Sequence, residues 1–156
     1  MPFPFPKPKV AIGLFTTNLP AMNHWLVKSE PSTYSWDQFV SDKRTDWTGV
    51  RNYGARLHLN AMRPGDPVLF YHSNDGKNIV GLAKVTKAAF PDKTADEDGW
   101  VAVELGAVKA LPSPVSLDQI KAEPALKDMV LINNSRLSVQ PVKPAEYAKI
   151  LKLGKG

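Results

Sequence analysis

Four short segments of the sequence place aromatic or cationic residues beside small hydroxyl or amide side chains. They are residues 24–31 (HWLVKSEP), 49–56 (GVRNYGAR), 70–74 (FYHSN) and 135–141 (SRLSVQP). An aromatic side chain stacks on a flat polar ring, an amide or hydroxyl group hydrogen-bonds the edge of that ring, and arginine or lysine binds phosphate. The four segments together predict a pocket that holds a nucleobase beside its phosphate backbone.

Eight residues are candidates for contact with the base. The aromatic ones offer a stacking surface, which contributes roughly 1–3 kcal/mol for each stacked base. Asn52 offers a donor and an acceptor from one amide, the serines offer hydroxyl groups, and His72 can both stack and donate. The predicted base-binding residues are Trp25, Ser29, Trp47, Asn52, Tyr53, Tyr71, His72 and Ser73.

Most of these residues also have an ordinary structural explanation. Large aromatic side chains dominate the cores of small domains, and Trp36 and Trp100, which lie outside the four segments, are assigned to the core. Asn52 stands where a helix would need an N-cap. Both roles are compatible, because the free N–H groups at a helix N-terminus also favour phosphate. His72 follows an apolar run, a position typical of a structural histidine.

Four cationic residues are candidates for contact with the nucleic-acid backbone: Lys28, Arg51, Arg56 and Arg136. The alternative for each is a surface salt bridge or a side chain laid over apolar surface. We favour phosphate contacts for Lys28 and Arg51, and leave both explanations open for Arg56 and Arg136.

Composition predicts one globular domain. The chain has 156 residues, 43% hydrophobic and 22% charged, with a net charge of +5. Residues 43–63 hold five basic residues and one acidic residue, with two aromatic residues among them, as on nucleic-acid-binding surfaces. There is no cysteine, and the three histidines lie far apart, so we expect no metal and no cofactor. A cytoplasmic location is also expected.

The elements that would position these residues are short. Ser35 and Ser116 each precede a glutamine at capping-box spacing. In the helix expected over residues 53–61, Tyr53, Leu57 and Ala61 share one face. Helices are predicted from Ser35 to about Ser41, over 53–61, from Ser116 until Pro124, and from Pro144 onward. Strands are predicted at 25–27, 67–71, 79–87, 100–107, 129–132 and 137–140.

Residues 1–22 differ from the rest of the chain. Prolines alternate with phenylalanine and lysine over residues 2–8, a pattern that neither a helix nor a central strand accepts. We expect this segment to be a disordered or misannotated extension, with Met22 an equally good start. Residues 23–156 are expected to form one α+β domain, a small open barrel of bent, largely antiparallel sheet with flanking helices.

The order of the segments WLVKSEP, WTGVRNYGAR, FYHS and RLSVQP resembles the EVE domain family of the PUA-like superfamily. The resemblance covers roughly residues 23–153. It implies a PUA-like β-barrel with flanking helices, and a reader of modified nucleobases related in fold to the YTH readers of methylated adenine. Asn133, Asn134 and Ser135 stand where bacterial members often carry a lysine or arginine, which puts one phosphate contact in doubt.

The expected function is a non-catalytic reader of a modified nucleobase, such as methylated cytosine or adenine, in DNA or RNA. The base would be turned out of its stack, or come from a single strand, into a slot bounded by Trp25, Trp47 and Tyr71. We expect a monomer without membrane contact. One alternative is an enzyme acting on nucleic acid, although neither a Gly-x-Ser-x-Gly elbow nor a zinc deaminase signature is present. The other is a scaffold that binds nucleic acid through charge alone.

Overall fold

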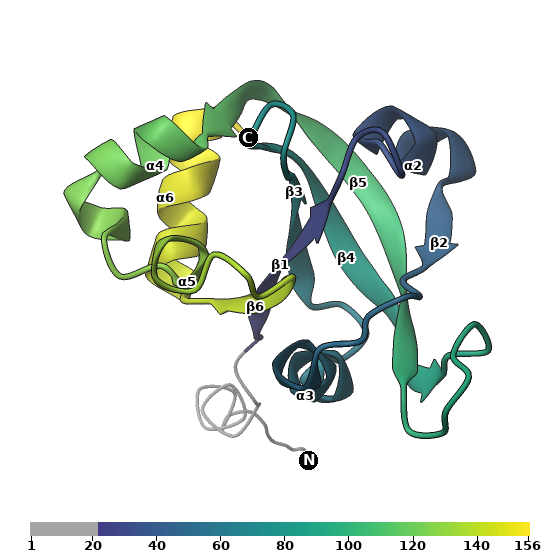
Figure 1. Cartoon of the computed structure of the whole chain (residues 1–156). Helices are drawn as coiled ribbons and strands as arrows, with labels where there is room; N and C mark the ends of the chain where they lie inside the picture. Colours follow the sequence, from purple (N-terminus) through teal and green to yellow (C-terminus); the bar gives the residue numbers. More distant parts are fainter. Residues whose placement is uncertain (1–21) are drawn as a thin grey trace, which may run out of the picture.

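A six-stranded sheet forms the centre of the protein (Figure 1). The computed structural model describes residues 22–156, so the expectation for residues 1–21 lies outside it. The strands run in the order β2-β5-β4-β3-β1-β6. Their bounds are β1 His24–Ser29, β2 Arg44–Asp46, β3 Pro67–His72, β4 Asn78–Pro91, β5 Val101–Ser116 and β6 Val139–Val142.

The sheet is mixed and does not close into a barrel. Strands β1 and β3 pair in parallel, and every other neighbouring pair is antiparallel. A parallel pair needs a long crossover connection, and here that connection carries helix α2 (Trp36–Asp42), strand β2 and helix α3 (Tyr53–Ala61). The predicted open α+β architecture is confirmed. The crossover between β1 and β3 also carries most of the candidate site.

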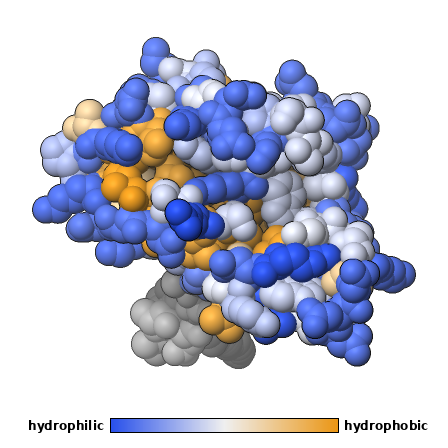
Figure 2. All heavy atoms as spheres, in the orientation of Figure 1, coloured by the Kyte–Doolittle hydropathy of each residue, from blue (hydrophilic) through white to orange (hydrophobic). Residues whose placement is uncertain are grey.

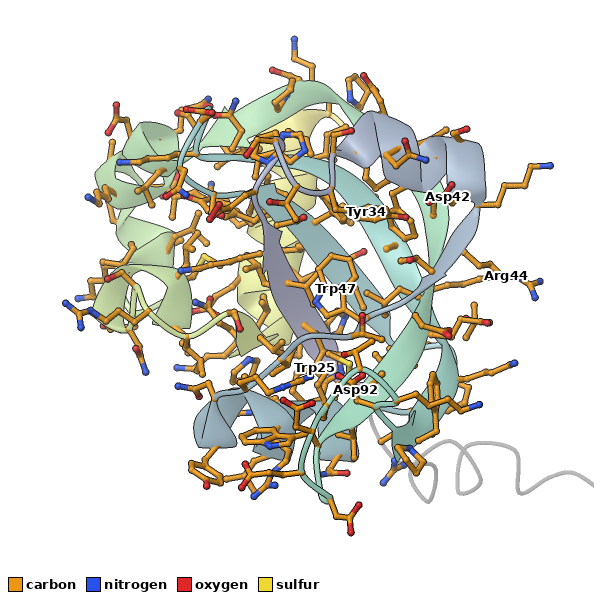
Figure 3. All side chains as sticks on the ribbon, turned by 45° about the vertical axis from the view of Figure 1, so that its right-hand side comes forward. Trp25, Tyr34, Asp42, Arg44, Trp47 and Asp92 are labelled. Carbon is orange, nitrogen blue, oxygen red and sulfur yellow. The ribbon has the colours of Figure 1, made fainter. Side chains whose placement is uncertain are left out.

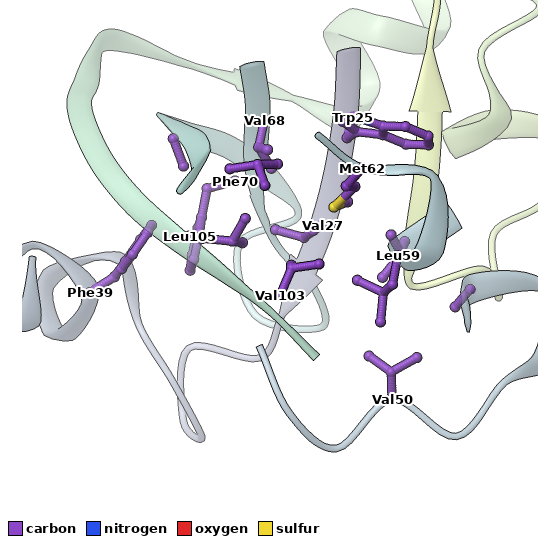
Figure 4. Packing of buried hydrophobic residues seen from close by; sticks show 14 of the residues in the cluster. Trp25, Val27, Phe39, Val50, Leu59, Met62, Val68, Phe70, Val103 and Leu105 are labelled. Atoms are coloured by element: carbon purple, nitrogen blue, oxygen red, sulfur yellow. The ribbon is translucent and has the colours of Figure 1, made fainter. Parts of the chain in front are cut away.

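Alternating side chains in the central strands face two separate hydrophobic clusters. In β1, Trp25 and Val27 join the first cluster, which packs under α2 and α3 (Figure 4). Leu26 joins the second cluster. Strand β3 divides in the same way, with Phe70 in the first cluster and Tyr71 in the second. Because side chains alternate with a period of two, apolar runs of this kind mark strands that are covered on both faces.

The second cluster is covered by the C-terminal part of the chain. Its helices are α4 (Leu117–Ala122), the 3-10 helix η2 (Pro124–Leu126), α5 (Val130–Asn133) and α6 (Pro144–Gly154). In Figure 1 they lie on one side of the sheet, away from α2 and α3. Figure 2 shows apolar residues gathered beside these helices and across the middle of a mostly hydrophilic face.

Helix starts follow the capping residues. The side chains of Ser35, Asn52 and Ser116 accept hydrogen bonds from the backbone N–H groups of Gln38, Ala55 and Gln119, at 3.1, 2.9 and 3.1 Å. These contacts satisfy N–H groups that have no partner within the helix. The predicted starts of α2, α3 and α4, and the proline at the start of α6, are confirmed.

Two strand predictions were wrong, and one strand was missed. Residues 129–132 were expected to form a strand, but helix α5 begins at Val130 and buries Leu131, because a short apolar run fits either period. The last strand lies at Val139–Val142 rather than 137–140. Helix α3 has the predicted bounds; the face that carries Tyr53 and Leu57 is exposed, and Ala55 and Leu59 fill the core. Strand β2, three residues long, was not predicted.

Helix α2 lies close against the sheet because strand β4 has a glycine beneath it. A Cβ atom at Gly81 would clash with the indole ring of Trp36. Trp36 and Phe39 of α2 pack edge-on against each other, and both rings contact Phe70 of β3 at 5.3 Å between centroids. This packing fixes the turn before α2, which forms one wall of the site.

Candidate functional site

An open cavity of about 550 Å³ lies where strand β1 ends. The end of β1 contributes Lys28–Glu30, and the turn before α2 contributes Thr33 and Tyr34. Strand β2 and the loop that follows it line the opposite wall with residues 45–51, and Ser138 completes the lining. A volume of this size is typical of small-molecule sites, and it is large enough for a nucleobase.

Two aromatic side chains meet inside this cavity. Trp47 and Tyr34 pack edge to face with ring centroids 6.2 Å apart, next to one another in Figure 3. Trp47 is half-buried, and its other neighbour is Phe70 of the core at 5.7 Å. The Tyr34 hydroxyl donates to Asp42 Oδ2 at 2.8 Å, and burial raises the pKa of Tyr34. Both rings are therefore held in fixed orientations before any ligand binds.

The wall made by residues 47–51 is tied to the β4–β5 connection through the buried carboxylate of Asp92. Asp92 Oδ2 accepts from the Gly49 N–H and from Arg51 Nη1, each at 2.9 Å. Asp92 Oδ1 accepts from the N–H and hydroxyl groups of Thr94 at 2.8 and 2.6 Å. Burial opposes the charge, but these hydrogen bonds outweigh it and hold the pKa of Asp92 well below its ordinary value.

Gly49 lets the chain turn at this wall. Its φ is +84°, a region that residues with a Cβ atom rarely adopt. The turn directs the Gly49 N–H at Asp92 while Trp47 faces the cavity. The GVRN segment therefore has a structural function in addition to any contact with a ligand.

Lys28 lies at the other side of the cavity. It is opposite Tyr71 in the β1–β3 register, with its Nζ 5.9 Å from the Tyr71 ring, and it donates to the carbonyl of Ser135. Burial lowers the pKa of Lys28 and raises that of Tyr71. The Ser29 hydroxyl donates to the carbonyl of Tyr34, which leaves its oxygen free to accept a hydrogen bond from a ligand.

The structure brings four of the twelve predicted site residues together in this cavity: Lys28, Ser29, Trp47 and Arg51. Of these, Arg51 forms an ion pair with Asp92 and donates a hydrogen bond to the Thr94 hydroxyl. Its side chain is therefore fixed as part of the cavity wall. Eight predicted residues do not line the cavity: Trp25, Asn52, Tyr53, Arg56, Tyr71, His72, Ser73 and Arg136.

The expected slot bounded by Trp25, Trp47 and Tyr71 is not formed. Trp25 of β1 pairs with Val68 of β3. Tyr71 lies three residues after Val68 in β3, so Trp25 and Tyr71 face opposite sides of the sheet. Each is only 4% exposed. The Trp25 indole donates to Asp66 Oδ2 at 2.9 Å, a buried contact that stabilises the turn before β3. Trp25 and Tyr71 are core residues, as the alternative explanation held.

The motif residues around α3 form a separate group. Asn52 is the N-cap of α3. Tyr53 and Arg56 extend from the first turns of the helix towards Trp100, outside the cavity. Trp100 is buried, with 8% of its surface exposed, as expected from the sequence.

The third and fourth segments, residues 70–74 and 135–141, mainly hold neighbouring parts of the backbone in place. The Ser73 N–H donates to the Ser29 carbonyl at 2.9 Å, which holds the end of β1 beside β3. Arg136 is exposed, and Gln140 is fully buried with its Nε2 donating to the Leu137 carbonyl at 2.7 Å. Of the fourth motif, Ser138 alone reaches the cavity.

His72 is a structural acceptor, and its titration predicts a pH dependence. Its Nε2 accepts from the Trp36 N–H at 3.0 Å, and burial lowers its pKa while Asp37 opposes that effect. Burial also lowers the pKa values of His24 and His58. As pH falls below the ordinary value of 6.5, the unfolded chain takes up protons that the folded chain resists, so stability must fall.

Urea unfolding at pH 7.5 and 5.5 measures this loss. The His72→Gln variant keeps an acceptor that does not titrate, so its stability should fall by less over the same interval. An equal fall in the wild type and the variant would contradict a contribution from His72.

Several lining residues had no signal in the sequence. Thr33, Tyr34 and Thr45 reach the cavity through the turn after β1 and through the unpredicted strand β2. Asp92 lies 41 residues from Arg51, so no local pattern connects the two.

Within residues 22–156, no helix has the length and apolar character that a membrane span requires. In the same part of the chain, no group of three or more histidine, aspartate or glutamate side chains is arranged to hold a metal ion.

Comparison with known proteins decides the family. The sequence profile of the EVE domain matches residues 23–153. The chain belongs to the EVE domain family. Thymocyte nuclear protein 1 of Rattus norvegicus is 36% identical over 165 residues, which covers 84% of this chain and 73% of that protein. The human protein of the same name is 34% identical with the same coverage.

Solved structures of similar proteins share the fold. An NMR structure of a Rhodopseudomonas palustris protein is 50% identical, with a TM-score of 0.82 over 86% of this chain and 94% of that one. A crystal structure of the human THYN1 protein in complex with 5-methylcytosine containing DNA is 32% identical, with a TM-score of 0.80 over 86% and 98%. The PUA-like α+β fold implied by the resemblance is confirmed.

Proposed function

We infer that this EVE domain is a non-catalytic reader that binds a modified nucleobase of DNA or RNA in the cavity at the end of β1. The observation that carries the proposal is the convergence of Trp47, Ser29 and Lys28 on one cavity of nucleobase size. The 5-methylcytosine containing DNA bound by the human THYN1 protein supports it. Trp47 supplies the stacking surface, and Lys28 supplies a cation for the phosphate beside the base.

Cavity polarity favours a base that carries an amino group. Glu30 and Asp46 place carboxylates in the lining, and Thr33, Thr45 and Thr48 add hydroxyl groups. Carboxylates accept hydrogen bonds from the exocyclic amine of cytosine, and adenine carries an equivalent amine. Cytosine, adenine and guanine carry an exocyclic amine and thymine does not, so this lining fits those three bases better than thymine.

A methyl group on the base adds apolar contact and little else. One buried methyl contributes about 1 kcal/mol, which corresponds to roughly a fivefold difference in Kd. Modest discrimination is therefore expected. Single-stranded nucleic acid, or a duplex opened at the modified position, is the favoured ligand, because unstacking then costs less.

The enzymatic alternative has weaker support. His72 uses its Nε2 to hold the start of α2, and Asp92 is occupied by four donors, so neither is free to act as a base. A Zymomonas mobilis ASCH protein shares the fold at 13% identity with a TM-score of 0.54, which bears on architecture and not on activity.

Paired binding measurements test the proposed function. Short strands that differ only by one methylated cytosine or adenine are titrated with the full chain. We expect one modified strand to bind about fivefold more tightly than its plain partner. Equal affinity for every modified strand and its plain partner would overturn the proposal.

A further inference from the structure

Outside the cavity, one exposed aromatic side chain is held rigidly against an arginine and a buried tryptophan. The ring centroids of Tyr53 and Trp100 lie 5.2 Å apart at an interplanar angle of 34°. The Arg56 guanidinium carbon lies 4.8 Å from the Tyr53 ring and 4.6 Å from the Trp100 ring. Arg56 Nη1 also donates to the Gly99 carbonyl at 3.1 Å, so the guanidinium is held by two rings and a carbonyl group.

Tyr53 is the first residue of α3 and is 68% exposed. The core contacts of that helix are made by Ala55 and Leu59. A large aromatic ring that is both exposed and ordered offers a stacking surface. Because Arg56 and Trp100 already restrict the ring, a ligand that stacks on it need not order it. Leu57, one turn along on the same face, is exposed to a similar extent, at 70%.

The group adjoins the cavity through Arg51. Arg51 lines the cavity, and its guanidinium carbon lies 5.9 Å from the Trp100 ring. No more than about 11 Å therefore separates the Arg51 guanidinium from the Tyr53 ring. That distance is about the rise of three stacked nucleotides, so a strand with one base in the cavity can reach Tyr53.

The nearby charges favour a base rather than a phosphate at this position. The turn before Gly99 carries Asp96, Glu97 and Asp98, which repel phosphate. The charge of Arg56 is directed at two rings and at a carbonyl group. An uncharged ring face is what remains available to a ligand.

From these contacts we propose that Tyr53, supported by Arg56 and Trp100, stacks the base of a nucleotide that flanks the modified one on the same single strand. The proposal rests on the proposed function for its first contact, the base in the cavity. It assigns a second site to this domain, selective for strand length rather than for the modification, because every base has a stacking face.

Strand length is the variable that tests the second site. The modified base is supplied as a mononucleotide, measured by NMR titration, and at the centre of a single-stranded heptanucleotide. We expect Tyr53→Ala to weaken heptanucleotide binding about 5- to 100-fold, as for a lost stacking contact, and to leave mononucleotide binding unchanged. Tyr53→Phe should bind like the wild type because it keeps the ring.

Leu57→Ala is the matched control, since it removes an equally exposed side chain from the same helix face. It should leave both affinities unchanged. If Tyr53→Ala weakened both ligands equally, or neither, or if Leu57→Ala had the same effect as Tyr53→Ala, the second site would be ruled out. A plain heptanucleotide separates the two proposals. If the modified heptanucleotide bound no more tightly than the plain one, the proposed reading of a modified base would be overturned. The second site would still be supported if Tyr53→Ala weakened binding of the plain heptanucleotide.

Discussion

Replacing Asp92 with alanine is expected to lower the free energy of unfolding by about 3 kcal/mol. The Asp92 side chain is fully buried and accepts four hydrogen bonds, two from backbone N–H groups and two from side chains. Alanine would leave the Gly49 and Thr94 N–H groups without their acceptor and would remove the ion pair of Arg51. Because the loop at residues 47–51 forms one wall of the cavity, binding of the modified strand should weaken as well.

Urea unfolding monitored by circular dichroism measures the stability change. Asp96→Ala is the matched control, because Asp96 is an exposed carboxylate in the same connection. Its effect should stay within about 0.5 kcal/mol. The loss of stability in Asp92→Asn should lie between the losses in Asp92→Ala and Asp96→Ala. An amide keeps the shape of the side chain but only one of its two acceptor oxygens.

Acid should remove the contribution of Asp92. Its pKa is depressed in the folded state, so its stabilisation is complete above the ordinary value of 3.8 and is lost as pH falls below it. The stability difference between the wild type and Asp92→Ala should therefore narrow in that range. A difference that is small at neutral pH, or equal to that of Asp96→Ala, would contradict the anchoring function of Asp92.

Replacing Trp47 with alanine is expected to weaken binding of the modified strand by about 5- to 100-fold. Trp47 is the predicted stacking residue that the structure places in the cavity, and Tyr34 and Phe70 hold its ring on two sides. The same change removes a half-buried indole from the first cluster and should lower the free energy of unfolding by up to about 3 kcal/mol. The measurement is Kd by fluorescence anisotropy, under conditions where the variant is fully folded.

Trp47→Phe separates stacking from packing. Phenylalanine keeps an aromatic face, so most of the affinity should return even though some stability is lost. Trp25 supplies a second comparison, because it lies in the same cluster but outside the cavity. Trp25→Phe should lower stability without changing affinity. A folded Trp47→Ala variant that binds like the wild type would remove Trp47 from the site.

Local sequence signals predicted the elements well where one residue decides the structure. The caps at Ser35, Asn52 and Ser116 set the starts of three helices, and Pro144 begins the fourth. The error at residues 129–132 arose where an apolar run of four residues has no capping residue or turn to distinguish a strand from one turn of helix.

The site was predicted less completely because it depends on register and on distant partners. Trp25 and Tyr71 were placed together although the parallel register of β1 and β3 directs them to opposite faces. The parallel direction of β1 and β3 requires the long crossover, and neither that direction nor the register can be read from a local pattern of residues. Tyr34 and Asp92 were missed because their partners lie elsewhere in the chain, whereas Lys28, Ser29, Trp47 and Arg51 stand in motifs that carry the chemistry locally.

The measurement that tests the reader most directly is the ratio of Kd values for one modified strand and its plain partner at two salt concentrations. Contacts with phosphate weaken for both strands as salt rises, whereas contacts of the modified group with the cavity do not depend on counterion release. The proposed function predicts that both Kd values rise with salt while their ratio stays near fivefold. A ratio of one at both salt concentrations would leave only a basic surface and contradict a base-reading cavity.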